Sequence, residues 1–158
     1  MALPESARDG EHSFVLHDEA PILVVPGLRA RFFVSRMGAT VAPAQGVTPL
    51  VGADLAPESA QRRAGSVPLD PSYEHLLVPM VGGVRVCGRD VRVGQAIYLG
   101  TDRDHLDLEL SADARVLLLG GPPFEEEIVM WWNFVARSHG KIEPREAAVE
   151  RRRRPQVR

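Results

Sequence analysis

The most informative segment of this chain is Ala114-Arg-Val-Leu-Leu-Leu-Gly-Gly-Pro-Pro-Phe-Glu-Glu-Glu-Ile-Val-Met-Trp-Trp-Asn-Phe-Val-Ala-Arg-Ser-His139. It contains both tryptophans of the chain and the unbroken apolar run Val116–Leu119, a pattern typical of a strand buried on both faces. The Gly-Gly-Pro-Pro sequence that follows ends this strand, because glycine and proline are poor at extending a ladder. A second apolar run, Ile128–Trp132, then predicts a further strand.

The rest of the chain repeats this pattern of short apolar runs separated by turn residues. Residues 105–110 alternate strictly between polar residues and leucines, which predicts a strand with one buried face. Pro79 predicts an edge strand or a bulge, and Gly82-Gly83 predicts a hairpin turn. The other expected strands cover residues 14–17, 22–25, 28–36, 48–55, 61–67, 73–81, 84–87, 91–93 and 96–99. Short strands at this spacing predict an all-β sandwich or barrel.

Composition narrows the function classes. The 158 residues suffice for one self-sufficient core, and 44% hydrophobic with 25% charged residues is usual for a soluble globular protein. A net charge of -2 argues against nucleic-acid binding driven by bulk charge. The single cysteine excludes an intrachain disulfide and a zinc site built from paired cysteines. No apolar run reaches membrane-spanning length and the N-terminus lacks a signal-peptide core, so we predict a cytoplasmic protein that binds neither membrane nor nucleic acid.

The strand predicted at residues 105–110 carries a row of polar side chains. His105, Asp107 and Glu109 alternate with leucines, so all three share one face. Imidazole and carboxylate groups are metal ligands, so this row could line the mouth of a barrel. The same alternation also fits a strand whose polar face meets water, and we favour that plainer interpretation. The chain has no phosphate loop, dinucleotide fingerprint or Gly-x-Ser-x-Gly nucleophile motif.

Four further features have both a functional and a structural interpretation. Cys87 could be a nucleophile, but without a neighbouring base we expect a buried, inert thiol. Glu125–Glu127 could form an acidic docking surface and Arg151–Arg154 could bind an acidic partner, although solvated chain explains both runs. Trp131-Trp132 could line a ligand pocket, although core packing explains this pair as well. None of these patterns identifies a catalytic residue.

Taken together, the motifs resemble the C-terminal half of bacterial pirins, which carry two cupin barrels in one chain. The resemblance is most specific at Leu117–His139, with its Trp-Trp-Asn-Phe-Val motif. The sequence begins where the second barrel of a pirin begins, so we expect the N-terminal, metal-binding barrel to be absent. Further segments agree with the family in the same order, namely Ala2–Glu5, Thr48–Leu55, Tyr73–Val84 and Gly94–Gly100.

The resemblance also divides the chain. It implies a single cupin-type β-barrel, or jelly roll, at residues 13–143, preceded by an extended arm at residues 1–12. The tail, residues 144–158, departs from the Glu-rich helix that often ends family members. Pro144 suits the first turn of a helix that runs to Glu150, and an arginine-rich end follows. We therefore expect an all-β fold with a short C-terminal helix.

In pirins the N-terminal barrel holds one iron-type metal through a His-x-His pair and a later His and Glu. That barrel is associated with quercetin 2,3-dioxygenase activity and, in some members, with redox-sensitive binding to transcription regulators. Projecting the ligand positions onto this chain puts Pro68 and Asp70 at the first pair, and Asp107 and Glu109 at the second. Carboxylates without imidazole make a poor iron(II) site, although they could hold a hard divalent ion weakly.

The resemblance therefore implies that this barrel binds no metal or other cofactor. Asp70, Asp107, Glu109 and His105 are the weak candidates for ligands. His105 or His75 would complete a site of mixed imidazole and carboxylate ligands only if the alignment with the N-terminal barrel were in a different register.

Three hypotheses follow for the function. The first is a non-catalytic, metal-free structural or interaction module, which corresponds to the second barrel of a bicupin and pairs with its own copy or with another cupin barrel. The second is a quercetin 2,3-dioxygenase-like oxidoreductase that uses iron or another divalent metal, an activity that a fold alone does not transfer. The third is a truncated pirin without a separate function. We favour the first, and the sequence leaves the ligand and the oligomeric state open.

Overall fold

The structure, a computed structural model, describes residues 16–37, 40–44, 46–131 and 134–136, together with residues 4, 7, 14, 138 and 140. The chain divides into two compact units. The larger unit is Glu11–Pro123, and the smaller one combines Met1–Gly10 with Phe124–Arg158.

The described residues form thirteen strands and no α-helix, which confirms the prediction of an all-β fold. Short runs rich in branched and aromatic residues, bounded by glycine and proline, account for this content. The strands are β1 (Ile22–Val25), β2 (Leu28–Met37), β3 (Thr40–Val41), β4 (Val51–Pro57), β5 (Arg63–Pro68), β6 (Glu74–Val81), β7 (Val84–Val86), β8 (Arg89–Val91), β9 (Ile97–Gly100), β10 (His105–Leu110), β11 (Arg115–Gly121), β12 (Val129–Trp131) and β13 (Phe134–Ala136).

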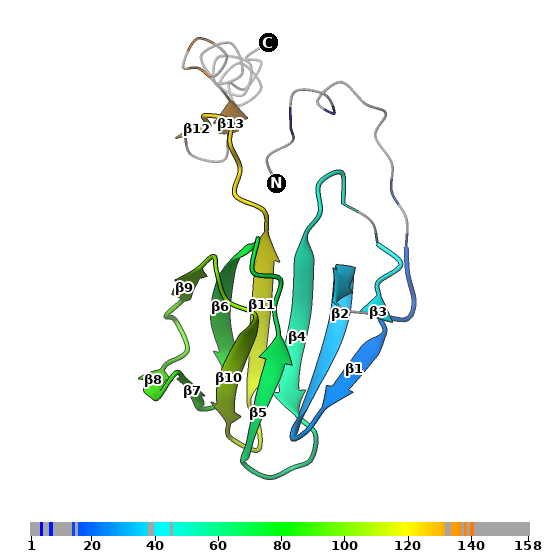
Figure 1. The fold of residues 1–158 in the computed structure, drawn as a ribbon, viewed down its shortest axis with the longest axis vertical. Helices are drawn as coiled ribbons and strands as arrows, with labels where there is room; N and C mark the ends of the chain where they lie inside the picture. The colour runs from blue at the N-terminus through cyan, green and yellow to red at the C-terminus, as the bar shows by residue number, and fades with distance from the viewer. Residues whose placement is uncertain are drawn as a thin grey trace, which may run out of the picture. The chain divides into compact units, whose positions relative to one another are not determined.

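Two antiparallel sheets build the larger unit. The large sheet has seven strands in the order β1-β2-β4-β11-β6-β9, with β3 paired to β2. The small sheet has four strands in the order β5-β10-β7-β8. Figure 1 shows β5 and β10 of the small sheet lying over β11 and its neighbours in the large sheet. The inward side chains of both sheets belong to one core cluster, so the core lies between the two layers.

Alternating apolar residues fill this core. On β10 the side chains of Leu106, Leu108 and Leu110 are buried, as the sequence alternation predicts. Phe32 of β2 and Leu118 of β11 are buried in the same cluster from the large sheet. Each buried leucine or phenylalanine contributes about 2–3 kcal/mol through its removal from water. The core therefore consists of apolar side chains on alternate positions of both sheets.

Strand β11 forms the middle of the large sheet and pairs with β4 on one side and with β6 on the other. Val116 and Leu118 are fully buried, whereas Leu117 is partly exposed and Leu119 is 37% exposed. The prediction that Val116–Leu119 is buried on both faces is therefore wrong. The reason is that an antiparallel sheet can cover a core with one face while its other face meets solvent.

The two turn predictions in β6 and after it have different outcomes. Pro79 lies at a bulge, because the pairing of β6 with β11 shifts register where Pro79 meets Val116. Gly82-Gly83 does not form a hairpin between paired strands, since β6 belongs to the large sheet and β7 to the small one. These glycines instead carry the chain from one sheet to the other, and Gly82 adopts a φ of 74°, a conformation that glycine tolerates.

The ends of the chain complete the description. The strand predicted at residues 14–17 is wrong, because Phe14, Leu16 and His17 lie outside any strand. In the smaller unit β12 and β13 form an antiparallel pair. The tail at residues 144–158, with its predicted helix, lies outside the described residues, as does the arm at residues 1–12 apart from positions 4 and 7. Within the described residues no helix is long and apolar enough to span a membrane.

Candidate functional site

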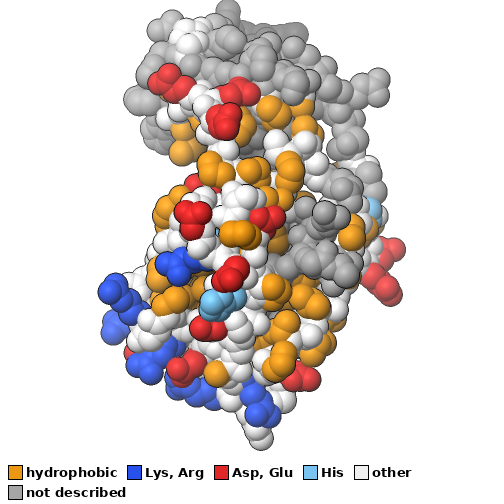
Figure 2. Space-filling view, viewed as in Figure 1, with side chains coloured by type: hydrophobic (Ala, Val, Ile, Leu, Met, Phe, Trp, Pro, Cys, Tyr) orange, Lys and Arg blue, Asp and Glu red, His pale blue; other side chains and the backbone are white. Residues whose placement is uncertain are grey.

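The row of polar residues predicted on β10 lies on the outer face of the small sheet. The leucines of β10 point into the core, so the side chains of His105, Asp107 and Glu109 face solvent and are 59%, 69% and 43% exposed. Figure 2 shows acidic and basic side chains mixed with a histidine on the visible face of the molecule. Asp107 and Glu109 line a shallow surface groove of about 600 Å³ together with residues of β5 and β7. The row therefore does not line the interior of the barrel.

His105 lies between two carboxylates. Its Nδ1–H donates to Asp104 Oδ1 at 2.5 Å, and its Nε2 lies 3.7 Å from Asp107 Oδ2. The hydrogen bond with Asp104, followed by the charges of Asp104 and Asp107, raises the pKa of His105. The same hydrogen bond lowers the pKa of Asp104. This arrangement favours a protonated imidazole, which is a donor of hydrogen bonds and not a metal ligand.

The remaining candidate ligands have structural partners. Glu109 forms an exposed ion pair with Arg62, in which Arg62 Nη2 lies 3.2 Å from Glu109 Oε2. Asp70 accepts hydrogen bonds from the backbone N–H of Ser72 at 3.0 Å and from its hydroxyl at 2.6 Å. The hydroxyl bond is the main reason that the pKa of Asp70 is lowered. Asp70 therefore closes the turn before β6, as short polar side chains often do.

The four candidates do not fit an iron-type site. Asp107 and Glu109 point away from the barrel interior, and Asp70 and Glu109 are held by other residues. The interior positions of β10 are leucines, which cannot bind a metal. Across the described ranges, no group of three or more His, Cys, Asp or Glu side chains is placed to hold a metal ion. The donor set thus lacks the converging imidazoles that such sites normally contain.

The structure also reveals a buried histidine that no sequence motif singled out. His75 of β6 is 1% exposed, and among the described residues its ring nitrogens make no hydrogen bond of good geometry, although backbone groups of Gly100 and Tyr73 lie near enough to raise its pKa slightly. Burial lowers the pKa of His75, and the nearby charge of Asp70 opposes that effect only in part. The ring packs against Gly120, where an added Cβ would lie 2.7 Å from His75 Cδ2. The sequence contained a signal for this burial, because His75 is two residues from Leu77 and four from Pro79 and so shares their strand face.

The expectation of a buried thiol at Cys87 is wrong. Cys87 is exposed and has a φ of 47°, because the chain turns directly after β7. Strand β7 ends at Val86, one residue before the end of the predicted strand at residues 84–87, so Cys87 lies outside the strand. The side chain lines the same shallow groove as Asp107 and Glu109. Among the described residues it belongs to no group of His, Cys, Asp or Glu placed to hold a metal ion.

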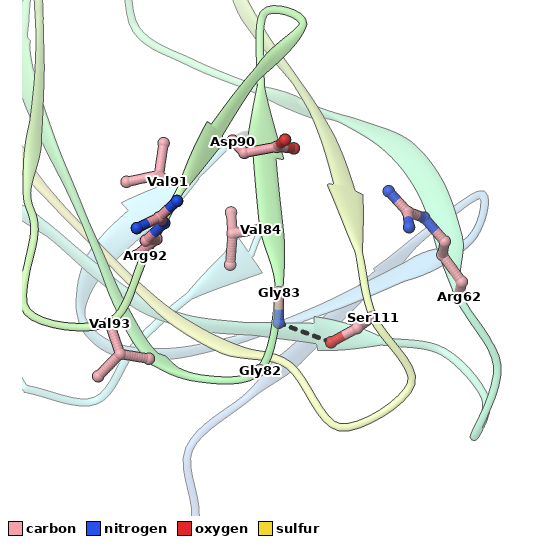
Figure 3. Close-up of a pocket in the computed structure, with 9 residues that line it drawn as sticks. All are labelled: Arg62, Gly82, Gly83, Val84, Asp90, Val91, Arg92, Val93 and Ser111. Atoms are coloured by element: carbon pink, nitrogen blue, oxygen red, sulfur yellow. Dashed lines mark hydrogen bonds between the residues drawn. The ribbon is translucent and has the colours of Figure 1, made fainter.

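A second hollow, of about 260 Å³, opens beside β7 and β8 (Figure 3). Arg62 and Arg92 lie on opposite sides of Val84 in this view, so their guanidinium groups do not converge. The hydroxyl of Ser111 accepts a hydrogen bond from the backbone N–H of Gly83 at 2.8 Å. The same hydroxyl donates to a carboxylate, Asp113 Oδ1, at 2.6 Å. The polar groups here hold the connection between β6 and β7.

The outer face of the large sheet carries a set of apolar side chains, which we call the outer apolar band. Register places Leu119 of β11 beside Leu76 of β6, and Leu76 beside Tyr98 of β9. On the other side of Leu119, the ring of Phe33 covers Gly52, since a Cβ on Gly52 would lie 2.4 Å from Phe33 Cε2. The band comprises Phe33, Leu76, Val78, Tyr98, Leu117 and Leu119, of which Phe33, Tyr98 and Leu119 are at least 37% exposed.

One end of the outer apolar band is basic. Arg29 and Arg31 of β2 and Arg115 of β11 surround Asp54 of β4 on the same face. Arg115 donates to both oxygens of Asp54 through Nε and Nη2, with Nε 2.9 Å from Oδ1. In the described part of the chain, no carboxylate pairs with Arg29 or Arg31. This end of the face, which we call the arginine end, therefore carries excess positive charge.

Comparison with known proteins supports the sequence resemblance. A family model described as the pirin C-terminal cupin domain matches residues 57–153. A Pseudomonas aeruginosa protein named "Putative quercetin 2,3-dioxygenase" is 41% identical over 150 residues, which cover 95% of this chain and 47% of that protein. A crystal structure of quercetin 2,3-dioxygenase from Acinetobacter baumannii matches with a TM-score of 0.86 and 33% identity, over 96% of this chain and 50% of that one.

A second structure of the same name from Acinetobacter baumannii matches with a TM-score of 0.63. At 20% identity over 84% of this chain and 46% of that one, it supports the fold alone. The chain spans about half the length of the relatives that it matches. These matches confirm both the predicted resemblance and the cupin-type barrel.

Proposed function

Since the chain belongs to the pirin C-terminal cupin family, we propose that it serves as a metal-free interaction module, a barrel that associates with a second cupin barrel. The observation that carries this proposal is the outer apolar band. A solvent-facing side of an antiparallel sheet normally alternates to polar residues, whereas this one presents Phe33, Leu119 and Tyr98 to solvent. Contiguous exposed apolar patches are typical of association sites.

The orientation of the candidate ligands supports the metal-free part of the proposal. In a cupin-type metal site the ligands converge inside the barrel, whereas Asp107 and Glu109 point out of this one. The apolar core occupies the interior positions of the same strand. Binding and packing therefore explain the residues of this barrel better than catalysis does.

Sedimentation velocity of the full chain tests the association. At micromolar concentration we expect a dimer or a higher oligomer, and replacing Leu119 with serine should weaken association about tenfold or more, because it puts a polar group in the middle of the band. The matched control is Val93→Ser, because Val93 is 56% exposed but lies outside the band. A wild-type chain that sediments as a monomer at every concentration would contradict the proposal.

The second candidate is a dioxygenase. It is favoured by the names of the two relatives that are more than 30% identical to this chain. The test is metal analysis after purification without a chelator, followed by oxygen uptake with quercetin. Stoichiometric metal that is lost in both Asp107→Ala and Glu109→Ala would overturn the preference for a non-catalytic module. Protein without metal and without oxygen uptake would support it.

A further inference from the structure

We infer that the partner of the outer face is a second copy of this chain, which docks the acidic segment Phe124–Met130 against the arginine end and the outer apolar band. This inference rests on the proposed function, because it specifies how the association occurs. It joins two observations, the arginines on β2 that have no acidic partner among the described residues and an exposed acidic and apolar segment after β11.

The receiving surface offers positive charge next to apolar area. Arg29, Arg31 and Phe33 lie on one strand, and a strand advances about 3.3 Å per residue, so Phe33 lies about 7 Å along the strand from Arg31 and about 13 Å from Arg29. Both arginines are exposed and lack an acidic partner in the described residues. Asp54, the cross-strand neighbour of Arg31, pairs with Arg115 through both oxygens and forms no ion pair with Arg29 or Arg31 among the described residues. An incoming carboxylate would therefore meet two guanidinium groups.

The docking segment offers the complementary groups at a similar spacing. Glu125 and Glu127 are exposed, and the apolar residues that follow, Ile128 and Met130, are 44% and 75% exposed. Glu127 directly precedes Ile128 and lies three residues before Met130, so at most about 11 Å of chain separates this carboxylate from the apolar side chains. Arginine binds carboxylates well because its planar donors match two oxygens.

The proposed contact is self-complementary, because each copy carries both the face and the segment. In a two-fold arrangement the segment of each copy meets the face of the other, so the same contact forms twice. The contact would also cover the outer apolar band and remove it from water. Charge pairs of this kind fix the orientation of a complex more than they add affinity. The association should therefore weaken as salt rises, because exposed charge pairs are screened.

Charge reversal tests the contact from both sides. The face variant carries Arg29→Glu and Arg31→Glu, and the segment variant carries Glu125→Arg and Glu127→Arg. Each alone should raise the dissociation constant about tenfold or more, because both contacts become repulsive. An equimolar mixture should recover wild-type association, because both contacts in the mixed dimer then pair opposite charges. The matched control is Arg89→Glu with Arg92→Glu, which makes the same charge change on exposed residues in β8 and directly after it.

The outcomes separate this inference from the proposed function. A wild-type monomer would overturn both. If Leu119→Ser loses association while the face and segment variants keep it, the proposed function stands and the inference fails. A mixture that fails to associate, from variants whose circular dichroism and melting match the wild type, also overturns the inference. The wild type gives an independent test, because association that is unchanged between low and high salt would contradict a contact built on charge pairs.

Discussion

His75 and His105 show how position alone gives one residue type two different chemistries. His75 is buried, and burial is the main cause that lowers its pKa. His105 is exposed beside Asp104 and Asp107, and their hydrogen bond and charges raise its pKa. Proton NMR titration of the imidazole Cε1–H signals should therefore give a midpoint below 6.5 for His75 and above 6.5 for His105. Equal midpoints for the two histidines would contradict both environments.

The buried histidine should also make stability depend on pH. Because the folded-state pKa of His75 lies below the unfolded value of 6.5, the unfolded chain takes up the proton first. The contribution of His75 is complete above pH 6.5 and is lost as the pH falls through its folded-state pKa, with a slope of at most about 1.4 kcal/mol per pH unit.

Urea unfolding between pH 6.5 and 5 measures this slope. His75→Leu should remove that component, because leucine fills the buried position without taking up a proton. His105→Gln is the control, since His105 shifts in the opposite direction and its replacement leaves the His75 component in place. An unchanged slope in His75→Leu would refute the assignment.

At this scale the sequence predicted strand faces better than residue environments. The strict alternation of residues 105–110 placed the leucines inside and the polar row outside, because the side-chain period of a strand is fixed. Cys87 was assigned to the core because a lone thiol usually packs there, but the local backbone turns at that residue. The spacing of His75 places it on the buried face of β6, but its close contact with Gly120 could not be predicted, because β11 lies far away in the sequence.

At the scale of strands, Gly120 of β11 makes the close packing against β6 possible. A Cβ at this position would lie 2.7 Å from His75 Cδ2 and 2.8 Å from the carbonyl oxygen of Glu74. Gly120→Ala should therefore lower the free energy of unfolding by about 1–3 kcal/mol through overpacking. Gly83→Ala is the control, because the nearest atoms to its Cβ are 3.7 Å away. Chemical denaturation of both variants checks this, and equal losses would contradict the packing argument.

Strand positions were predicted well, but strand partners were not. Turn residues mark where a strand ends, so β1, β2, β6 and β10 lie within a few residues of their predicted ranges. The partner of a strand depends on contacts across the whole barrel, so Gly82-Gly83 was assigned to a hairpin although it connects two different sheets. The local sequence shows where the chain turns, but it does not show which of the two sheets the next strand joins.

At the scale of the whole molecule, stability should not depend on divalent metal. The described residues contain no converging group of ligands, and the carboxylates of Asp107 and Glu109 face solvent. A ligand that binds only the folded state raises the melting temperature, so removal of a structural metal would lower it. We expect a chelator such as EDTA to change the melting temperature by less than about 1 °C. A larger fall that is reversed by added iron(II) would contradict a metal-free barrel.

The family and fold were predictable because the Trp-Trp-Asn-Phe-Val segment is distinctive and short strands dominate the chain. The candidate site was less predictable. Projection from a related barrel gave Asp70, Asp107 and Glu109 as positions, but it carried no information on where those side chains point. The outer apolar band was also missed, because its members come from four strands, β2, β6, β9 and β11, that only the fold brings together.

The position of β11 in the chain has a consequence for synthesis on the ribosome. This strand is the last one of the larger unit, yet it fills the gap between β4 and β6 in the middle of the large sheet. The backbone edges of β4 and β6 that face β11 therefore stay unpaired until residues 115–121 leave the exit tunnel. At about 5–20 residues per second, synthesis of the chain between β6 and the end of β11 takes several seconds. During that interval the nascent chain presents open strand edges to its neighbours, and chaperone binding at this stage would protect it from misassembly.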